Sequence, residues 1–129
     1  MIEVEKKFTL TKEQERKLVD GAMLINEKTF VDVYYDAPQY GLTTKDWWLR
    51  RRDETFELKI RPRNIGVQQM CVYEEISDET EIRRRLGLVE HGSLSQDLIN
   101  AGYEIMVVIT THRRTYQKDA FTLVFDTAT

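Results

Sequence analysis

Apolar and polar residues alternate along several short segments of this chain, and this period of two is typical of β-strands. Lys28 opens one such segment, rich in β-branched and aromatic residues, and Ile105 opens the strongest β-forming run. Short turns between some of the segments, such as the one at Asp53, favour hairpins. The pattern predicts strands over residues 2–8, 28–36, 47–52, 56–61, 69–77, 104–116 and 121–126.

Three short helices are predicted from their capping residues. Thr11 is a suitable N-cap, and Gln14 completes a capping box for a helix that runs to about residue 20. The other capping signals are Ser77 or Asp78 with Gly87, and Ser95 with Gly102. Many hairpin-linked strands with a few helices indicate an α+β fold, either an antiparallel sheet or an antiparallel β-barrel, in a single domain over residues 1–129.

The composition excludes several classes of function. Hydrophobic residues make up 41% of the 129 residues and charged residues 32%, which fits one globular core. A net charge of −3 argues against general nucleic-acid binding but allows a local basic pocket. Cys71 is the only cysteine, so the chain forms no internal disulfide. The sequence has neither an apolar run of about 20 residues nor a signal peptide, and a cytoplasmic location without membrane contact is expected.

The first predicted strand carries charge on one face. Glu3, Glu5 and Lys7 alternate with other residues, so an extended backbone points all three to the same side. Burying two carboxylates and an ammonium is costly without partners. A divalent cation suits the carboxylates and an anion suits the lysine, which favours a protein that handles polyphosphate groups through a metal.

The same alternation of charge recurs on later strands. Arg50 and Arg52 share a face, and Lys59 lies on a polar face opposite Phe56 and Leu58. If these faces met inside a barrel, the interior would hold five cations and four carboxylates. They are Lys7, Arg50, Arg52, Lys59 and Arg113, with Glu3, Glu5, Glu75 and Asp126. Arginine suits phosphate oxygens and clustered carboxylates suit Mg²⁺, so the set favours phosphoanhydride hydrolysis.

Other chemistry-bearing residues have simpler interpretations. Charges that alternate along one strand are usually a solvated face, and residues 83–85, three arginines on a predicted helix, are interpreted as surface charge. His91 and His112 lack zinc-ligand spacing with each other or with Cys71. Cys71 has no identifiable His and Asp partners, which argues against a nucleophilic cysteine.

These motifs, taken in order, resemble the CYTH superfamily, the triphosphate tunnel metalloenzymes. The matching segments span nearly the whole chain and begin with the Glu3-x-Glu5-x-Lys7 pattern. They continue over residues 32–36, 48–52, 57–59, 73–75, 111–113 and 125–128. The segment at residues 48–52 is most similar to the animal thiamine triphosphatase branch of that superfamily.

The resemblance implies an eight-stranded closed tunnel that holds a triphosphate. Lys7, Arg50, Arg52, Lys59 and Arg113 would then grip phosphate oxygens, and Glu3, Glu5, Glu75 and Asp126 would hold Mg²⁺ and orient water. Trp48 would face the cationic ring of thiamine. Tyr34 would pair with Lys7 as a proton-handling dyad, since an ammonium favours the phenolate; Tyr73 is the competing partner.

This chain also departs from the family pattern. It stops a few residues after the last predicted strand, before the second acidic strand of the family, so we expect a truncated domain with weak or no activity. His112 and Tyr116 replace a more usual lysine and tryptophan.

The implied reaction is Mg²⁺-dependent release of the terminal phosphate from thiamine triphosphate, by a protein that is monomeric at full length. Inorganic triphosphatase and adenylyl cyclase activities are the alternatives within the fold. A polyphosphate- or nucleotide-binding module without hydrolysis, and a plain structural domain, remain alternatives outside it.

Overall fold

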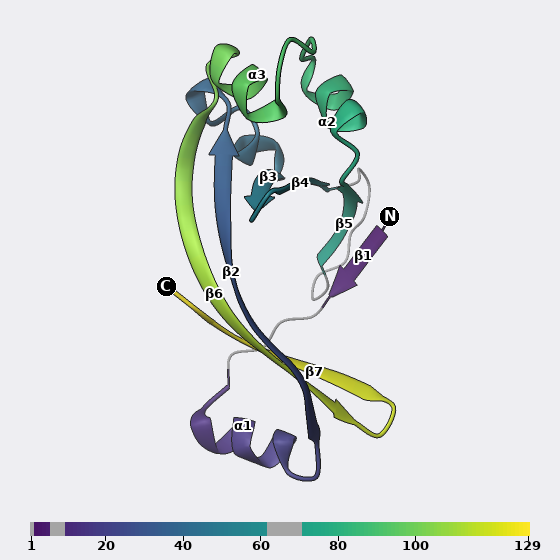
Figure 1. Cartoon of the computed structure of the whole chain (residues 1–129). Coiled ribbons are helices and arrows are strands. Elements are labelled where there is room, and N and C mark those ends of the chain that lie inside the picture. Colours follow the sequence, from purple (N-terminus) through teal and green to yellow (C-terminus); the bar gives the residue numbers. More distant parts are fainter. Residues whose placement is uncertain (1, 6–9, 62–70) are drawn as a thin grey trace. The chain divides into compact units, whose positions relative to one another are not determined.

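The computed structural model describes the backbone of residues 2–5, 10–61 and 71–129, and the side chains of residues 10–61 and 73–129. Within these ranges, the strands occur mostly in consecutive runs, with short helices between the runs (Figure 1). The strands are β1 (Ile2–Glu5), β2 (Met23–Asp36), β3 (Trp47–Arg52), β4 (Thr55–Ile60), β5 (Cys71–Ile76), β6 (Glu104–Lys118) and β7 (Phe121–Ala128). The helices are α1 (Lys12–Val19), α2 (Glu79–Leu86) and α3 (Leu94–Asn100), with short 3₁₀ turns η1 (Pro38–Tyr40) and η2 (Thr43–Lys45).

The chain divides into two compact units. The first comprises residues 1–6 and 32–108, and the second comprises residues 7–31 and 109–129, so β2 and β6 contribute to both. In the first unit the strand order is β1-β5-β4-β3-β2, and in the second β2, β6 and β7 are neighbours. The registered pairs are all antiparallel, so the expectation of an antiparallel α+β fold is confirmed.

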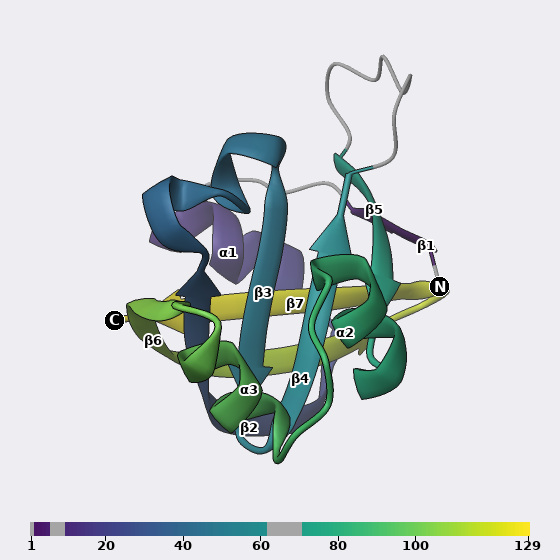
Figure 2. The same ribbon diagram turned by 90° about the horizontal axis from the view of Figure 1, so that it is seen from above.

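One face of the first unit's sheet is packed and apolar. Leu49 on β3 and Leu58 on β4 are essentially inaccessible to solvent, as strand parity predicts. The side chains that cover them come from α2 and α3, and both helices lie over β3 and β4 in Figure 2. Ile82, Leu94 and Leu98 contribute the helical part of this core. The opposite face of the same strands is therefore left for polar side chains.

Local sequence explains where the helices begin and end. Thr11 and Gln14 form the expected capping box at the start of α1. Asp78 caps α2, which ends at Gly87 in a left-handed conformation with φ of 70°. The cap of α3 is Ser93 and not Ser95, since the Ser93 hydroxyl accepts a hydrogen bond from the backbone N–H of Gln96.

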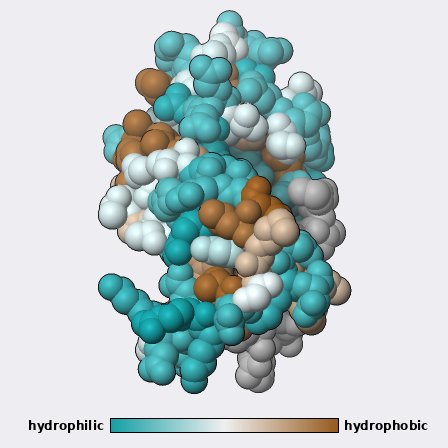
Figure 3. All heavy atoms as spheres, turned by 60° about the horizontal axis from the view of Figure 1, so that its bottom comes forward, coloured by the Kyte–Doolittle hydropathy of each residue, from teal (hydrophilic) through white to brown (hydrophobic). Residues whose placement is uncertain are grey.

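The second unit packs α1 against β6. Arg114 forms an ion pair with Glu15, and the Lys118 ammonium donates to the Leu18 carbonyl oxygen at 3.3 Å. This unit leaves large apolar side chains exposed, with Met23 and Phe121 about 70% accessible. Figure 3 shows apolar atoms gathered in a patch among hydrophilic ones on the face that it draws.

Among the described residues, no helix is long and apolar enough to span a membrane.

Candidate functional site

The polar face of β3 and β4 carries a row of cations, each held by a carboxylate from a neighbouring strand. Arg50 lies directly opposite Glu57 in the antiparallel register, and their side chains approach to 2.7 Å. Both side chains are more than four-fifths buried. The Nε of Arg50 is buried and has no hydrogen-bond partner among the described residues, so Glu57 does not satisfy every donor of this guanidinium.

Arg52 is the most firmly held cation of this row. Its Nε and Nη2 donate to the two carboxylate oxygens of Asp32 at 2.7 and 2.9 Å, and the register places Asp32 directly opposite on β2. This hydrogen-bonded pairing raises the pKa of Arg52, so the guanidinium stays charged. The side chain of Asp32 is only 6% exposed, whereas that of Arg52 is 26% exposed. Arg52 therefore has a fixed orientation and still reaches solvent.

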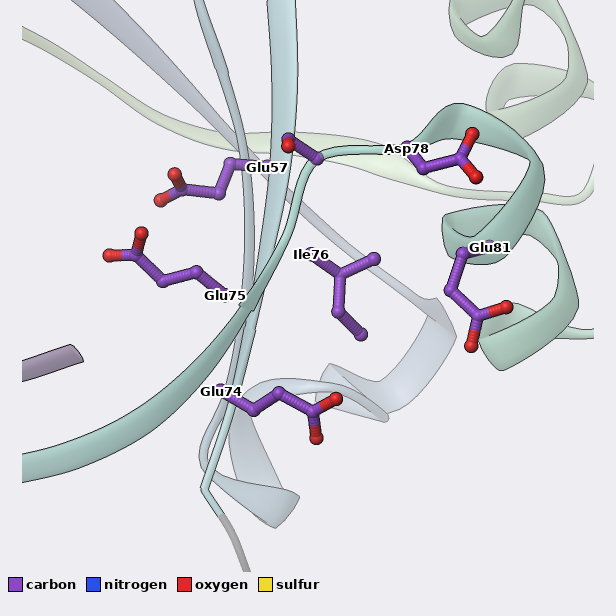
Figure 4. A pocket seen from close by; sticks show the side chains of 7 residues that line it. Glu57, Glu74, Glu75, Ile76, Asp78 and Glu81 are labelled. Carbon is purple, nitrogen blue, oxygen red and sulfur yellow. The ribbon is translucent and has the colours of Figure 1, made fainter. Parts of the chain in front are cut away.

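Lys59 completes the row of cations on β4. It lies opposite Glu75 of β5, and its Nζ is 3.6 Å from a Glu75 carboxylate oxygen. Figure 4 shows that Glu75 and Glu57 extend to the same side of β5. Both residues line a pocket of about 500 Å³. The rest of the lining consists of Glu74, Ile76, Ser77, Asp78 and Glu81. Arg85 forms ion pairs with two of these residues, Glu74 and Glu81.

An aromatic group lies beside Lys59 on the same polar face, because Trp48 is directly opposite Lys59 in the β3–β4 register. The ring of Trp48 meets that of Tyr34 edge-on, with centroids 6.4 Å apart. The indole Nε1 of Trp48 donates to Asp46 at 2.7 Å, and the hydroxyl of Tyr73 donates to the same carboxylate at 3.1 Å. Arg61 also pairs with Asp46, which raises the pKa of the Arg61 guanidinium. Asp46 thus joins residues from β3 and β5 and the residue after β4.

The second unit holds Arg113, the fourth predicted cation whose side chain the structure describes. Arg113 donates to both carboxylate oxygens of Asp126 at 2.8 and 2.9 Å, across the β6–β7 pairing. Its guanidinium also lies over the ring of Phe30 at 5.0 Å. Beside it, His112 bonds to Glu27 and Thr29 through its two ring nitrogens.

The acidic residues of the first strand are described only by their backbone. Glu3 lies opposite Tyr73 and Glu5 opposite Cys71 in the β1–β5 register, while Lys7 lies outside the described residues. Within the part of the chain whose side chains are described, no three His, Cys, Asp or Glu side chains form a metal-binding group. Carboxylates are nonetheless the donors that Mg²⁺ prefers, so the chemistry of the predicted set of four fits this ion.

The structure brings Trp48, Arg50, Arg52, Lys59, Glu75 and Tyr34 onto one polar face in the first unit, and pairs Arg113 with Asp126 in the second. Sequence reasoning missed Asp32 and Asp46 as partners. The strand pairing of residues 32–36 with 48–52 would have indicated Asp32 opposite Arg52. Asp46 comes from a turn with no local signal.

The prediction that residues 83–85 are all surface charge is wrong for Arg83. This residue is 7% exposed, and its guanidinium donates to Asp97 at 3.1 Å and to the Gly92 carbonyl oxygen at 3.0 Å. Burial alone would raise the pKa of Asp97, but hydrogen bonds from His91, Gly92 and Arg83 outweigh it and lower the pKa. The pair links α2 to α3.

Comparison with known proteins agrees with this geometry. The family model of the CYTH domain matches residues 1–129. The chain is 38% identical over 105 residues to a thiamine-triphosphatase of Macaca fascicularis, and 39% identical over 89 residues to one of Homo sapiens. These alignments cover 79% and 67% of this chain but 44% and 38% of the relatives, so the chain spans less than half of their length.

Solved structures share the fold at low sequence identity. The PH1819 protein of Pyrococcus horikoshii superposes with a TM-score of 0.60 at 16% identity, covering 99% of this chain and 71% of the other. The PH1012 protein of the same organism gives a TM-score of 0.52 at 17% identity, with coverage of 99% and 71%. Because the family model covers every residue and the fold agrees, the chain belongs to the CYTH domain family.

Proposed function

We propose that this chain binds the triphosphate group of thiamine triphosphate and, with Mg²⁺, takes part in hydrolysing its terminal phosphoanhydride to give thiamine diphosphate and phosphate. The observation that carries the proposal is the row of cations on the polar face of β3 and β4. Arg50, Arg52 and Lys59 are each held by a carboxylate of an adjacent strand. Such pairing fixes the direction of the cations before a ligand arrives, which lowers the entropic cost of binding.

The cations would act on the phosphate oxygens. A guanidinium donates two parallel hydrogen bonds to phosphate, and an ammonium acts as a compact point charge. Negative charge spreads over the phosphoryl oxygens during transfer, so donors aimed at them lower the barrier. In this proposal Lys7 and Arg113 add to the set, and Tyr34 with Lys7 handles the proton; Tyr73 is the alternative partner.

Mg²⁺ would be held by Glu3, Glu5, Glu75 and Asp126, whose oxygens are suitable ligands for this ion. When bound, the ion would neutralise phosphate charge and polarise the attacking water. Glu75 is 90% buried and lies beside Lys59 of the cationic row. The proposed acting form at full length is a cytoplasmic monomer that acts on a small molecule.

The choice of substrate is supported by the relatives. The two curated relatives are named thiamine-triphosphatase, at 38% and 39% identity. Trp48, on the same polar face as the cations, has an aromatic ring suited to a cationic thiazolium. The relatives are more than twice as long as the segment that matches this chain. We therefore propose the complete reaction for the full-length protein, and we expect only a low rate from these 129 residues.

The test is phosphate release from thiamine triphosphate, inorganic triphosphate and ATP, with Mg²⁺ and with a chelator. We expect Mg²⁺-dependent release with thiamine triphosphate preferred, and release lowered at least about tenfold in Arg50→Met. Arg51→Met is the matched control, because Arg51 is the neighbouring arginine and lies on the opposite face of β3. Equal rates for the three substrates in a full-length homologue, or equal loss in both variants, would contradict the proposal.

A second function, polyphosphate binding without hydrolysis, is favoured by one observation. Two of the four proposed metal ligands are already engaged with cations, Glu75 with Lys59 and Asp126 with Arg113. Calorimetry separates the two functions: tight triphosphate binding without turnover supports the binding module, and Mg²⁺-dependent turnover excludes it.

A further inference from the structure

Asp46 occupies a position that no pattern in the sequence assigned to the site. It follows η2 and has φ of 61° and ψ of 39°, a left-handed conformation that few residue types adopt readily. Its carboxylate is about one-third exposed and accepts hydrogen bonds from three side chains, those of Trp48, Arg61 and Tyr73. A turn residue with three such partners is placed to fix their directions.

The bond to Trp48 is the shortest of the three, at 2.7 Å. An indole has one polar atom, its Nε1–H, so this single bond determines how the ring turns about its side-chain torsions. Tyr34 meets the ring edge-on at an interplanar angle of 87°, which supports the ring from a second side. Together these contacts hold one indole orientation at the end of the cationic row.

We propose that Asp46 is a positioning residue that sets selectivity for the organic end of the substrate by fixing Trp48. This inference rests on the proposed function, because it takes thiamine triphosphate as the ligand. A cation is attracted to an aromatic ring only over its face, so the strength of the contact depends on ring orientation. A carboxylate acceptor on the indole N–H also polarises the ring and makes its face more negative. Inorganic triphosphate has no organic end and gains nothing from either effect.

The test compares affinities for thiamine triphosphate and inorganic triphosphate by calorimetry. Glycine and asparagine both adopt the left-handed backbone conformation, so neither variant strains the turn. Asp46→Gly removes the hydrogen-bond acceptor, whereas Asp46→Asn keeps an acceptor oxygen that carries no charge. We expect Asp46→Gly to weaken binding of thiamine triphosphate about tenfold and of inorganic triphosphate less than twofold. Asp46→Asn is expected to stay within about threefold of the wild type for both ligands. Asp53→Gly is the matched control, since Asp53 is a left-handed aspartate with φ of 54° in the β3–β4 turn.

A double-variant cycle shows whether Asp46 acts through the indole. In a Trp48→Phe background the acceptor has no N–H to bind, so Asp46→Gly is expected to have no further effect on thiamine triphosphate affinity. A second measurement needs no ligand and uses the Trp47→Phe background, in which Trp48 is the only tryptophan in the sequence. There, Asp46→Gly is expected to increase quenching of Trp48 emission by acrylamide, and Asp53→Gly is not.

Several results would overturn the inference. Equal weakening of both ligands in Asp46→Gly would show a structural role alone, and so would additive effects in the cycle. Unchanged binding of thiamine triphosphate in Asp46→Gly would overturn the inference while leaving the proposed function intact. Failure of the wild type to bind thiamine triphosphate would overturn both.

Discussion

Replacing Arg52 by methionine separates the stabilising role of this residue from its proposed role in binding. The change keeps most of the aliphatic stem and removes the guanidinium that donates to Asp32 at 2.7 and 2.9 Å. Asp32, whose side chain is only 6% exposed beside Arg52, would then lose both donors.

The cost can be worked from these contacts. Removing one partner of a fully buried ion pair typically costs about 3–5 kcal/mol, because the other charge stays buried. The Arg52 side chain is 26% exposed, so water can reach part of the vacated space and the cost is smaller. We expect a loss of about 2 kcal/mol in the free energy of unfolding, or roughly 6–10 °C in Tm for a domain of this size.

Chemical denaturation measures the stability, and calorimetry with inorganic triphosphate measures the binding. The double variant Asp32→Asn/Arg52→Met removes the stranded charge, so it is expected to recover at least half of the lost stability. It is not expected to recover affinity for triphosphate, since the cation that would contact phosphate is still absent. Recovery of affinity with stability would refute the reasoning, because Arg52 would then act only by holding the sheet together.

Three further changes test the fold. Leu58→Ala is expected to destabilise the protein by about 3 kcal/mol in urea denaturation, since Leu58 is fully buried in the core; a loss under about 1 kcal/mol would contradict that packing. Gly87→Ala is expected to cost about 1 kcal/mol in the same assay, because Gly87 has φ of 70° at the end of α2; an unchanged midpoint would contradict the left-handed cap. Burial raises the pKa of Asp36, but hydrogen bonds from Thr43, Leu42 and Ala37 outweigh it and lower the pKa. Its stabilisation is therefore present above about pH 4 and lost as pH falls through the lowered pKa, and Asp36→Asn is expected to flatten that part of the stability profile.

Strand parity predicted the polar and apolar faces of the sheet because it depends only on the extended backbone. Phe56, Leu58 and Ile60 are buried as this period requires, and Glu57 and Lys59 lie on the other face. The cationic row could be predicted for the same reason. The direction of each cationic side chain could not be predicted, because it depends on which strand pairs with β3 or β4 and in which register.

Contacts between distant parts of the sequence explain the errors. Arg83 looked like surface charge because its partner Asp97 lies 14 residues away on another helix. The strand β2 begins at Met23, five residues before the predicted start, since pairing with a neighbouring strand extends it beyond the segment with β-forming residues. The cap of α3 moved from Ser95 to Ser93 because either serine satisfies the local rule.

The most direct test of the central claim is calorimetric titration of inorganic triphosphate into the wild type, Lys59→Ala and Arg84→Ala. Lys59 lies on the cationic row beside Glu75, whereas Arg84 is an exposed cation on α2 paired with Glu81. If the polar face of β3 and β4 binds linked phosphates, Lys59→Ala weakens binding about tenfold or more and Arg84→Ala leaves it unchanged. Equal affinity in all three proteins would contradict the account.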